Sequence, residues 1–409
     1  MKILLVHNKY KQAGGEDNVF NAESELLERH GHEVEQILFD NSVIRTFMDK
    51  CLNGLRVFYN PSSARLIGKK IAAFKPDVIH VHNFIPLISP SIFYVASKHR
   101  IPIILTLHNF RLICPSATLY HNNSVYEKSL ESYFPFDAVL KGVYRHSIFQ
   151  TAMLALTIGL HHFIGTWRTK VDFYIALTSF AKSKFVSAKV PLPAEKILIK
   201  PNSVQDCGMG TARRRDHFLF VGRLVEEKGL RTLLQATWKS PFRLIIIGDG
   251  PMQQEVIDHT KKNPNVIYLG PQNKTTVITH MKACAALIFP SLWYEGLPLT
   301  LIEAFSAGTP VIASKLGAME ELIQHEVNGL LFESGNERDL VRCIEAIQHE
   351  QVDVNEMSER GRATYLRYFT PERNYNLLLT IYNRAIAMKH ALPGKWDNKL
   401  IHEMKGVTG

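Results

Sequence analysis

The distribution of apolar positions along the chain predicts a regular alternation of strands and helices. Short runs rich in isoleucine, leucine and valine, bounded by glycine, proline or polar residues, are typical of buried strands. In the first half such runs lie at residues 2–7, 77–81, 101–107 and 172–177, and helices are predicted over 16–30 and 90–99. This alternation predicts a mostly parallel sheet with helices on both faces.

The same alternation restarts after a segment of different composition. Residues 200–216 are rich in glycine, polar and charged residues, which is typical of a linker. Further strands are predicted at 217–222, 243–247, 266–269, 285–289 and 310–313. After Thr370 and Pro371, a helical pattern continues to about His390. We therefore predict an α/β fold with two Rossmann-like domains, 1–200 and 201–370, followed by a terminal helix over 371–390.

Two glutamates stand eight residues apart where the strand 285–289 passes into a helix. Gly296 supplies a turn, and Pro298 fits the first position of a helix that Gly308 ends. Glu295 is therefore expected in the loop and Glu303 inside the helix. Carboxylates accept hydrogen bonds from sugar hydroxyls, so the pair favours a polyol ligand.

The first turn of the same predicted helix contains the backbone N–H groups of Leu299 and Thr300. These donors have no acceptor within a helix, and the positive end of the helix dipole adds to their attraction for a phosphate. Together with the two glutamates, they predict a ligand that carries both a phosphate and a sugar.

Two cations occupy the loop after the strand 217–222, in the sequence Val-Gly-Arg-Leu-Val-Glu-Glu-Lys-Gly. Arg223 and Lys228 would lie at the carboxyl edge of the sheet, where α/β proteins bind ligands, and could neutralise a leaving diphosphate. A solvated charged loop is the alternative. After the next strand, Gly248 and Gly250 flank Asp249 in a turn that lets backbone approach a ligand closely.

These segments together closely resemble the signature of the GT4 family of retaining glycosyltransferases with the GT-B fold. The matching residues are 221–229, 248–251 and 290–313. The resemblance implies two Rossmann-like domains whose parallel sheets face each other across a cleft. The acceptor domain comes first, the nucleotide-sugar donor domain second, and the terminal helix crosses back to the first.

The resemblance also implies roles for single residues. Arg223 and Lys228 would hold the pyrophosphate, Glu295 the hydroxyls of the donor sugar and Glu303 the ribose. The turn at Gly248 would lie near the base. Glu295 as a covalent nucleophile is the competing assignment.

The first domain contributes two weaker candidates. Gly14 and Gly15 follow the first strand, where glycine permits close approach to a diphosphate and a helix begins. His108 ends the strand 101–107, at the place where the family carries an active-site histidine; a hydrogen-bonded structural histidine is the alternative. His80 and His82 are less specific candidates for binding the acceptor.

Asn202 is a further expected donor-binding residue. In this chain Asn202-Ser203-Val204 replaces the family's common Asn-Gly-Val. The serine therefore departs from the family pattern at this contact.

The charge of the chain favours an acidic partner. The net charge is +10 and the pI is about 9.2. Nucleic acid is not expected, because there is no long basic run, zinc-finger spacing or RNA-binding motif. Five cysteines without a Cys-x-x-Cys pair, and an amino terminus unlike a signal peptide, favour a cytoplasmic protein.

Residues 147–167 contain no Asp, Glu, Lys or Arg, and basic residues flank them on both sides. We favour a helix that is partly buried and partly laid on an anionic membrane surface over a helix that spans the membrane. A plain core helix is the alternative.

We therefore expect a glycosyltransferase that moves a hexose from a nucleotide-diphosphate sugar to a lipid-linked or soluble glycan, with retention. The assembly of bacterial O-antigen, capsule or exopolysaccharide, at the inner face of the membrane, would be its setting. No Asp-x-Asp is present to hold a metal on a diphosphate, so we expect no metal and no cofactor.

The same sequence features leave other functions open. A sugar-nucleotide epimerase of the same fold, or a non-catalytic relative that binds nucleotide sugars, are the alternatives. A dehydrogenase is disfavoured because no Gly-x-Gly-x-x-Gly follows the first strand of either domain.

Overall fold

The computed structural model describes residues 1–9, 14–40, 56–210 and 217–390. The chain forms two compact units. The first unit comprises residues 1–115, 128–200 and those from 375 onward, and the second comprises 116–127 and 201–374. Each unit is described on its own.

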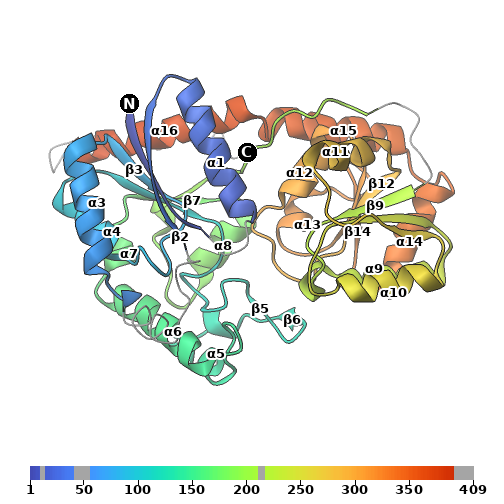
Figure 1. Ribbon diagram of the computed structural model, residues 1–409, viewed down its shortest axis with the longest axis horizontal. Coiled ribbons are helices and arrows are strands. Elements are labelled where there is room, and N and C mark those ends of the chain that lie inside the picture. Colours follow the sequence, from blue (N-terminus) through green and yellow to red (C-terminus); the bar gives the residue numbers. More distant parts are fainter. Residues whose placement is uncertain (10–13, 41–55, 211–216, 391–409) are drawn as a thin grey trace. The chain divides into compact units, whose positions relative to one another are not determined.

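The first unit is built on a six-stranded parallel sheet (Figure 1). Its strand order is β2 (Glu33–Asp40), β1 (Lys2–Lys9), β3 (Val78–Val81), β4 (Ile103–Leu107), β7 (Phe173–Ala176), β8 (Ile197–Ile199). The sheet confirms the strands that the apolar runs predict. The order reverses between β1 and β3, and α/β proteins bind ligands beside the carboxyl ends of strands at such a point.

Alternate side chains of these strands pack under two helices that are far apart in sequence. Ile3 and Leu5 of β1 belong to one buried cluster with Phe20 of α1 (Gly15–Arg29) and Tyr382 of α16 (Pro371–His390). The terminal helix therefore forms part of the hydrophobic core of the first unit. The helices α3 (Pro61–Phe74) and α4 (Ser91–Lys98) pack against each other.

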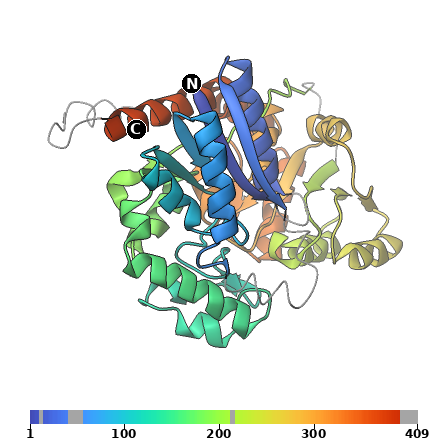
Figure 2. The same ribbon diagram turned by 60° about the vertical axis from the view of Figure 1, so that its left-hand side comes forward.

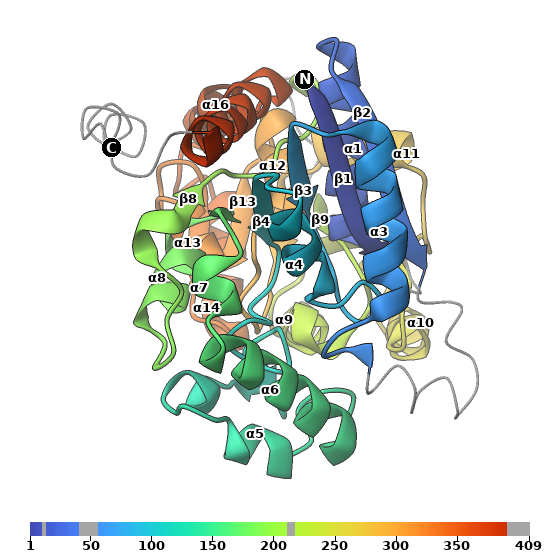
Figure 3. The same ribbon diagram turned by 90° about the vertical axis from the view of Figure 1, so that its left-hand side faces the viewer.

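A helical subdomain lies between β4 and β7. It contains α5 (Phe136–Leu140), α6 (Ile148–Phe163) and α7 (Thr166–Thr169), and α8 (Ser179–Ser187) follows β7. Figures 2 and 3 show α5 and α6 side by side, at the end of the first unit opposite to α16. Among the described residues, no helix has both the length and the apolar content needed to cross a membrane.

The second unit contains another six-stranded parallel sheet. Its strand order is β11 (Val266–Tyr268), β10 (Arg243–Ile247), β9 (His217–Val221), β12 (Ala286–Phe289), β13 (Val311–Ser314), β14 (Leu330–Phe332). The sequence predicts the first five of these, while β14 is too short to stand out as an apolar run. Here the order reverses between β9 and β12.

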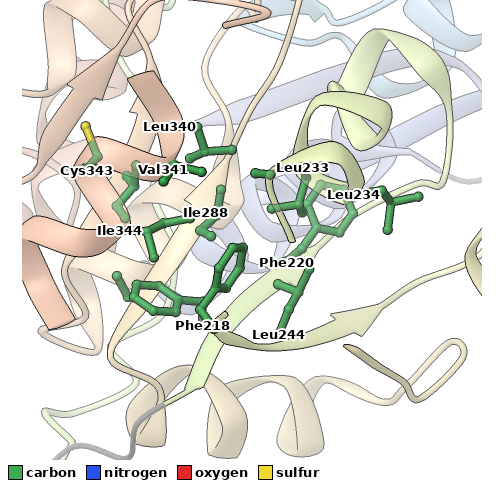
Figure 4. Close-up of a cluster of buried hydrophobic side chains, with 14 of the residues drawn as sticks. Phe218, Phe220, Leu233, Leu234, Leu244, Ile288, Leu340, Val341, Cys343 and Ile344 are labelled. Atoms are coloured by element: carbon green, nitrogen blue, oxygen red, sulfur yellow. The ribbon is translucent and has the colours of Figure 1, made fainter. Parts of the chain in front are cut away.

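The core of the second unit forms between this sheet and two helices (Figure 4). Phe218 and Phe220 of β9 pack with Leu233 of α9 (Leu230–Lys239) and Ile344 of α14 (Glu337–Gln348). The helices between the later strands are α10 (Gln253–Lys262), α11 (Lys274–Ala283), α12 (Leu299–Ser306) and α13 (Ala318–Leu322). Next along the chain from α14 comes α15 (Val354–Tyr368), which packs against α12.

A short hairpin from the first half of the sequence belongs to the second unit. Its strands are β5 (Tyr120–His121) and β6 (Ser124–Val125). The amide nitrogen Nδ2 of Asn123 donates to Glu226 Oε1 at 2.7 Å. The division at residue 200 that the sequence suggests therefore differs from the structural division in residues 116–127.

Candidate functional site

Two loops meet where the strand order of the second sheet reverses. One follows β9 and contains the short 3-10 helix η4 (Glu226–Lys228), and the other follows β12. Gly229 of the first loop packs against Pro290 of the second. Its φ is +69°, and a Cβ there would lie 1.7 Å from the carbonyl oxygen of Pro290. Glycine is therefore required for the loops to approach this closely.

The approach places Lys228 against Glu295. The Lys228 ammonium lies 2.6 Å from Glu295 Oε1, and Ser291 Oγ and Trp293 Nε1 donate to the same oxygen at 2.5 and 2.6 Å. Glu295 is 8 % exposed. The Lys228 ammonium also lies over the ring of Trp293, 5.6 Å from its centroid. The structure thus brings together two residues predicted from separate motifs, and adds two donors that the sequence did not suggest.

Helix α12 begins one residue later than predicted. Pro298 is the N-cap, with ψ of 112°, and Leu299 is the first helical residue. The prediction that Pro298 is the first helical residue was wrong, because the sequence does not distinguish a proline at the N-cap from one at the first helical position. Leu299 and Thr300 still occupy the first turn, so their N–H groups have no acceptor within the helix.

Glu303 lies inside α12, as predicted, and its carboxylate has a cationic partner. Lys274 Nζ donates to Glu303 Oε1 at 2.9 Å, and the Glu303 side chain is 16 % exposed. Gly296 lies in the loop before the helix. The carboxylate is therefore held at the surface of the unit by a lysine that the sequence did not single out.

The loop that carries Arg223 pairs with the turn after β10. Gly248 has φ of +142°, and a Cβ there would lie 1.9 Å from the Gly222 carbonyl oxygen. The N–H of Leu224 donates to the Asp249 carbonyl at 2.6 Å. Gly250 packs against the backbone of Leu224 in the same way. The two predicted glycine positions are therefore required by the packing of the loops themselves.

Arg223 is the most accessible of the predicted cations. Its side chain is 54 % exposed, and Nη2 lies 3.6 Å from Glu227 Oε1. An ion pair this exposed contributes little to stability. The guanidinium is therefore available to a ligand at small cost.

The hairpin at 116–127 contacts this region of the second unit. Burial, together with a hydrogen bond to Glu127, raises the pKa of Tyr294. Burial, reinforced by the carboxylates of Glu227 and Glu226, raises the pKa of Tyr120 to about 12. Both phenols therefore stay protonated at neutral pH. Tyr294 directly precedes Glu295 in the sequence and hydrogen-bonds to Glu127 of the hairpin segment.

In the first unit, His108 follows β4 and lines a pocket with His82, Asn109 and Arg111. Its Nε2 lies 3.0 Å from His82 Nδ1. Burial lowers the pKa of His108 to about 3. With its pKa lowered this far, the imidazole is neutral at physiological pH in the ligand-free chain and can act at the pocket through hydrogen bonding.

A buried ion pair lies behind this histidine. Lys200 is fully buried and its ammonium pairs with Glu23, which is 4 % exposed. His82 Nε2 lies 3.4 Å from the other carboxylate oxygen of Glu23. The prediction that Lys200 begins a linker was wrong, because its side chain returns into the core of the first unit. The Lys200, Glu23, His82 and His108 side chains form a continuous polar chain.

His80 has a structural role. It is fully buried, its Nε2 lies 2.7 Å from Thr106 Oγ1, and its Nδ1 lies 2.8 Å from the hydroxyl of Tyr382 in α16. Of the two histidines, one of which was expected to help bind the acceptor, only His82 lines the pocket that contains His108.

Within the described part of the chain, Glu23, His80 and His82 are close enough to hold a metal ion, with ligand atoms within 4.8 Å of one another. The Lys200 ammonium, however, already balances the charge of Glu23. A divalent cation would add a second positive charge beside it among buried side chains. The donor set therefore fits an ion pair better than a metal.

The remaining predicted donor residues are Gly14, Gly15 and Asn202. A Cβ at Gly15 would meet no atom within 4 Å, and the N–H of Gly14 donates to Asp17 Oδ2 at 2.8 Å. The part of the preceding loop at 10–13 lies outside the described residues. Asn202 is 4 % exposed, and its Oδ1 has no hydrogen-bond partner among the described residues. Its buried oxygen is a candidate acceptor for a ligand.

We expect the first unit to lose stability in acid. Burial lowers the pKa values of His80, His82 and His108 in the folded chain. An unfolded histidine titrates near 6.5, so in acid these three bind protons preferentially in the unfolded state. The contribution of these histidines to the free energy of unfolding is complete above about pH 6.5 and declines as the pH falls towards 3. Below the unfolded pKa, each histidine lowers the free energy of unfolding by up to about 1.4 kcal/mol per pH unit.

Urea unfolding between about pH 7.5 and pH 5 measures this decline. The variant His108→Gln is expected to show a shallower decline than the native chain. Equal slopes in the two proteins would contradict the assignment of a neutral His108.

Comparison with known proteins agrees with these features. Residues 13–205 match the family described as Glycosyltransferase Family 4, and residues 210–364 match Glycosyl transferases group 1. The O-antigen chain mannosyltransferase C of Escherichia coli is 27 % identical over 176 residues, which are 42 % of this chain and 47 % of that protein. The chain thus spans less than half the length of this relative.

A second relative aligns almost end to end. The N-acetyl-alpha-D-glucosaminyl L-malate synthase of Bacillus anthracis is 24 % identical over 402 residues, 93 % of this chain and 97 % of that protein. Among solved structures, Anabaena HepE in complex with UDP has a TM-score of 0.66 at 16 % identity, and covers 94 % of this chain and 100 % of its own. The structural likeness shows a shared fold.

Proposed function

Because the chain belongs to the group 1, family 4 glycosyltransferases, we propose that it transfers a sugar from a nucleotide-diphosphate sugar to a hydroxyl of a lipid-linked glycan. The contact of Lys228 with Glu295 carries this proposal. It sets a cation for the leaving diphosphate beside a carboxylate for the sugar hydroxyls.

The leaving group is the part of the donor that this site suits best. As the bond to the anomeric carbon breaks, negative charge grows on the diphosphate. Lys228 and Arg223, with the first-turn N–H groups of α12, would meet that charge. Uridine is the first donor base to test, because Anabaena HepE was solved in complex with UDP.

The hydrogen bonds of Glu295 favour a binding role over a nucleophilic one. Three donors hold Oε1, so the carboxylate is fixed in orientation and its charge is partly neutralised. Its second oxygen would accept from a donor-sugar hydroxyl. In the resulting retaining mechanism, the acceptor hydroxyl attacks from the leaving-group face and passes its proton to a phosphate oxygen.

We expect transfer to be independent of metal. Protein cations take the place that a divalent ion would occupy on the diphosphate, so activity in EDTA should equal activity in magnesium within about twofold. Transfer assays with and without EDTA on the same preparation test this. Loss of activity in EDTA, restored by magnesium, would contradict it.

An exposed apolar face supports an acceptor at the membrane. Helix α6 presents Phe149, Leu156, Leu160 and Phe163, which are 60, 46, 45 and 90 % exposed. Their spacing places them on one side of the helix. Such a contiguous patch is unusual on a monomeric soluble protein. The helix is therefore half core and half surface, as expected for a helix that rests on a lipid layer.

The charge around this face suits an anionic surface. Residues 128–190 contain eight Lys or Arg and three Asp or Glu. Arg145 and Arg168, which flank α6, are exposed. Each basic residue near an anionic lipid surface contributes about 1 kcal/mol to binding.

We expect the double variant Phe149→Ser, Phe163→Ser to lose binding to vesicles. The apolar contacts supply most of the insertion energy, so the partition coefficient should fall at least about tenfold at low salt. Cosedimentation with vesicles that contain phosphatidylglycerol measures it. Trp238→Ser is the matched control, because Trp238 is 56 % exposed but lies on α9 of the second unit.

Equal partitioning of the double variant and the native chain would contradict the membrane contact. So would an equal loss in the Trp238 variant.

The function itself is tested by incubating the purified chain with a labelled nucleotide sugar and a lipid-linked glycan extract. Label that moves into the lipid fraction supports the proposal. Donor converted to another sugar nucleotide without an acceptor would identify an epimerase. Donor that binds but stays unchanged would identify a non-catalytic relative.

A further inference from the structure

The first unit contains an apolar pocket beside the exposed face of α6. Four residues of the helix line it, Ala155, Ile158, Gly159 and His162, whose spacing of three and four places them on one side. Tyr133 also lines the pocket and is 75 % exposed. The pocket is a shallow depression that is partly open to solvent.

The pocket adjoins the exposed apolar face of α6 and the pocket that contains His108. On one side, Gly159 and Ala155 alternate along α6 with the exposed Leu156 and Leu160. On the other side, Leu112 lines both this pocket and the one that contains Arg111 and His108. An elongated ligand could therefore extend from the apolar helix face, past Arg111, to the predicted catalytic histidine.

We propose that this pocket binds the isoprenoid chain of the lipid carrier, at the units nearest its diphosphate. The inference rests on the proposed function, because it assigns one part of the lipid-linked acceptor to a place on the chain. The apolar lining suits a branched hydrocarbon, and Arg111 suits the diphosphate. The sugar end of the acceptor then reaches His108 and Asn109.

The charge and the shape together select this occupant. Most of the residues that line the pocket are apolar, with Ser129, Ser132 and His162 as the polar exceptions, so the pocket suits a hydrocarbon better than a soluble glycan. The excess of basic residues in 128–190 favours a ligand whose apolar chain ends in a diphosphate. An isoprenyl diphosphate combines both properties.

Gly159 provides a matched pair of variants. A Cβ at this position would meet Phe134 Cδ2 at 3.7 Å, an ordinary contact, so Gly159→Ala fits the helix. The longer side chain of Gly159→Leu extends into the pocket. The alanine variant controls for the change in helix backbone, and the leucine variant fills the space.

The test measures the binding of farnesyl diphosphate and of inorganic pyrophosphate to the full chain by calorimetry. We expect farnesyl diphosphate to bind at least about tenfold more tightly than pyrophosphate. Gly159→Leu should lower the affinity for farnesyl diphosphate at least about tenfold, and Gly159→Ala should lower it less than about twofold. Pyrophosphate binding should stay unchanged in both variants.

A second measurement does not depend on a variant that folds. A benzophenone-bearing isoprenyl diphosphate, irradiated with the native chain, should label peptides that contain residues 112–115 and 155–162. Equal binding of farnesyl diphosphate and pyrophosphate, an unaffected leucine variant, or labelling confined to other segments would overturn the inference.

Failure here is separable from failure of the proposed function. If the native chain glycosylates the lipid-linked extract but does not prefer farnesyl diphosphate, only the pocket assignment is wrong. If it binds farnesyl diphosphate in this pocket but transfers no sugar, the proposed function is wrong.

Discussion

Lys228→Ala is expected to lower the rate of sugar transfer by about 10²- to 10³-fold, because removing one preorganised donor to developing charge costs this much in other enzymes. The ammonium lies at the reversal point of the second sheet, 2.6 Å from Glu295 and with its side chain only 17 % exposed. The fold should survive, because Ser291 and Trp293 still donate to Glu295. Initial rates with labelled donor, beside thermal unfolding midpoints, measure both effects.

Lys261→Ala is the matched control. Lys261 lies in the same unit and pairs with Asp258 at 2.8 Å, but its side chain is 65 % exposed. Its removal should leave the rate unchanged. Transfer at the native rate by the Lys228 variant, or loss of folding in it, would mean that the lysine is a structural charge. Glu295→Ala is expected to abolish transfer with the fold retained.

Lys200→Met is expected to destabilise the first unit by about 3 to 5 kcal/mol, because it leaves the Glu23 carboxylate charged and buried without its partner. Burial opposes the charge of Glu23, while Lys200 and His80 favour it, and the net effect lowers its pKa. Urea unfolding followed by circular dichroism measures the loss. The double variant Lys200→Met, Glu23→Leu should recover part of it, since no charge then remains buried.

Lys70→Met serves as the comparison for this second prediction. Lys70 pairs with Glu35 at 2.7 Å, but both side chains are exposed, at 48 and 36 %. Its loss should cost less than about 1 kcal/mol. If the Lys200 variant were no less stable than the Lys70 variant, the buried pair would not be a stabilising element.

Local sequence patterns predicted most of the fold. The strands are short apolar runs between glycines and polar residues, a pattern that depends only on neighbouring residues, and both parallel sheets are confirmed. The end of α12 was also predicted correctly. It ends at Ser306, and Gly308 follows with φ of +62°.

Long-range contacts could not be predicted in this way. Lys200 and Glu23 are 177 residues apart, and nothing near either marks it as buried. The hairpin at 116–127 joins the second unit through Asn123, which is 103 residues from Glu226. Such contacts depend on tertiary packing.

The donor site shows the same division. Glu295 and Lys228 were predicted from their motifs, and the structure places them in contact. The roles of Ser291, Trp293 and Lys274 were missed because serine, tryptophan and lysine are common in loops and helices. Only the fold shows that their polar atoms face the two glutamates.

The central claim is that the second unit binds a nucleotide-diphosphate sugar between Lys228 and Glu295. The most direct test is the thermal unfolding midpoint of the full chain against a panel of UDP, GDP, dTDP and CMP sugars, first in EDTA and then in magnesium. The account predicts that one nucleotide-diphosphate sugar raises the midpoint equally in both conditions, and that Lys228→Ala removes the shift. A shift that requires magnesium, a shift retained by the Lys228 variant, or no shift with any donor would contradict it.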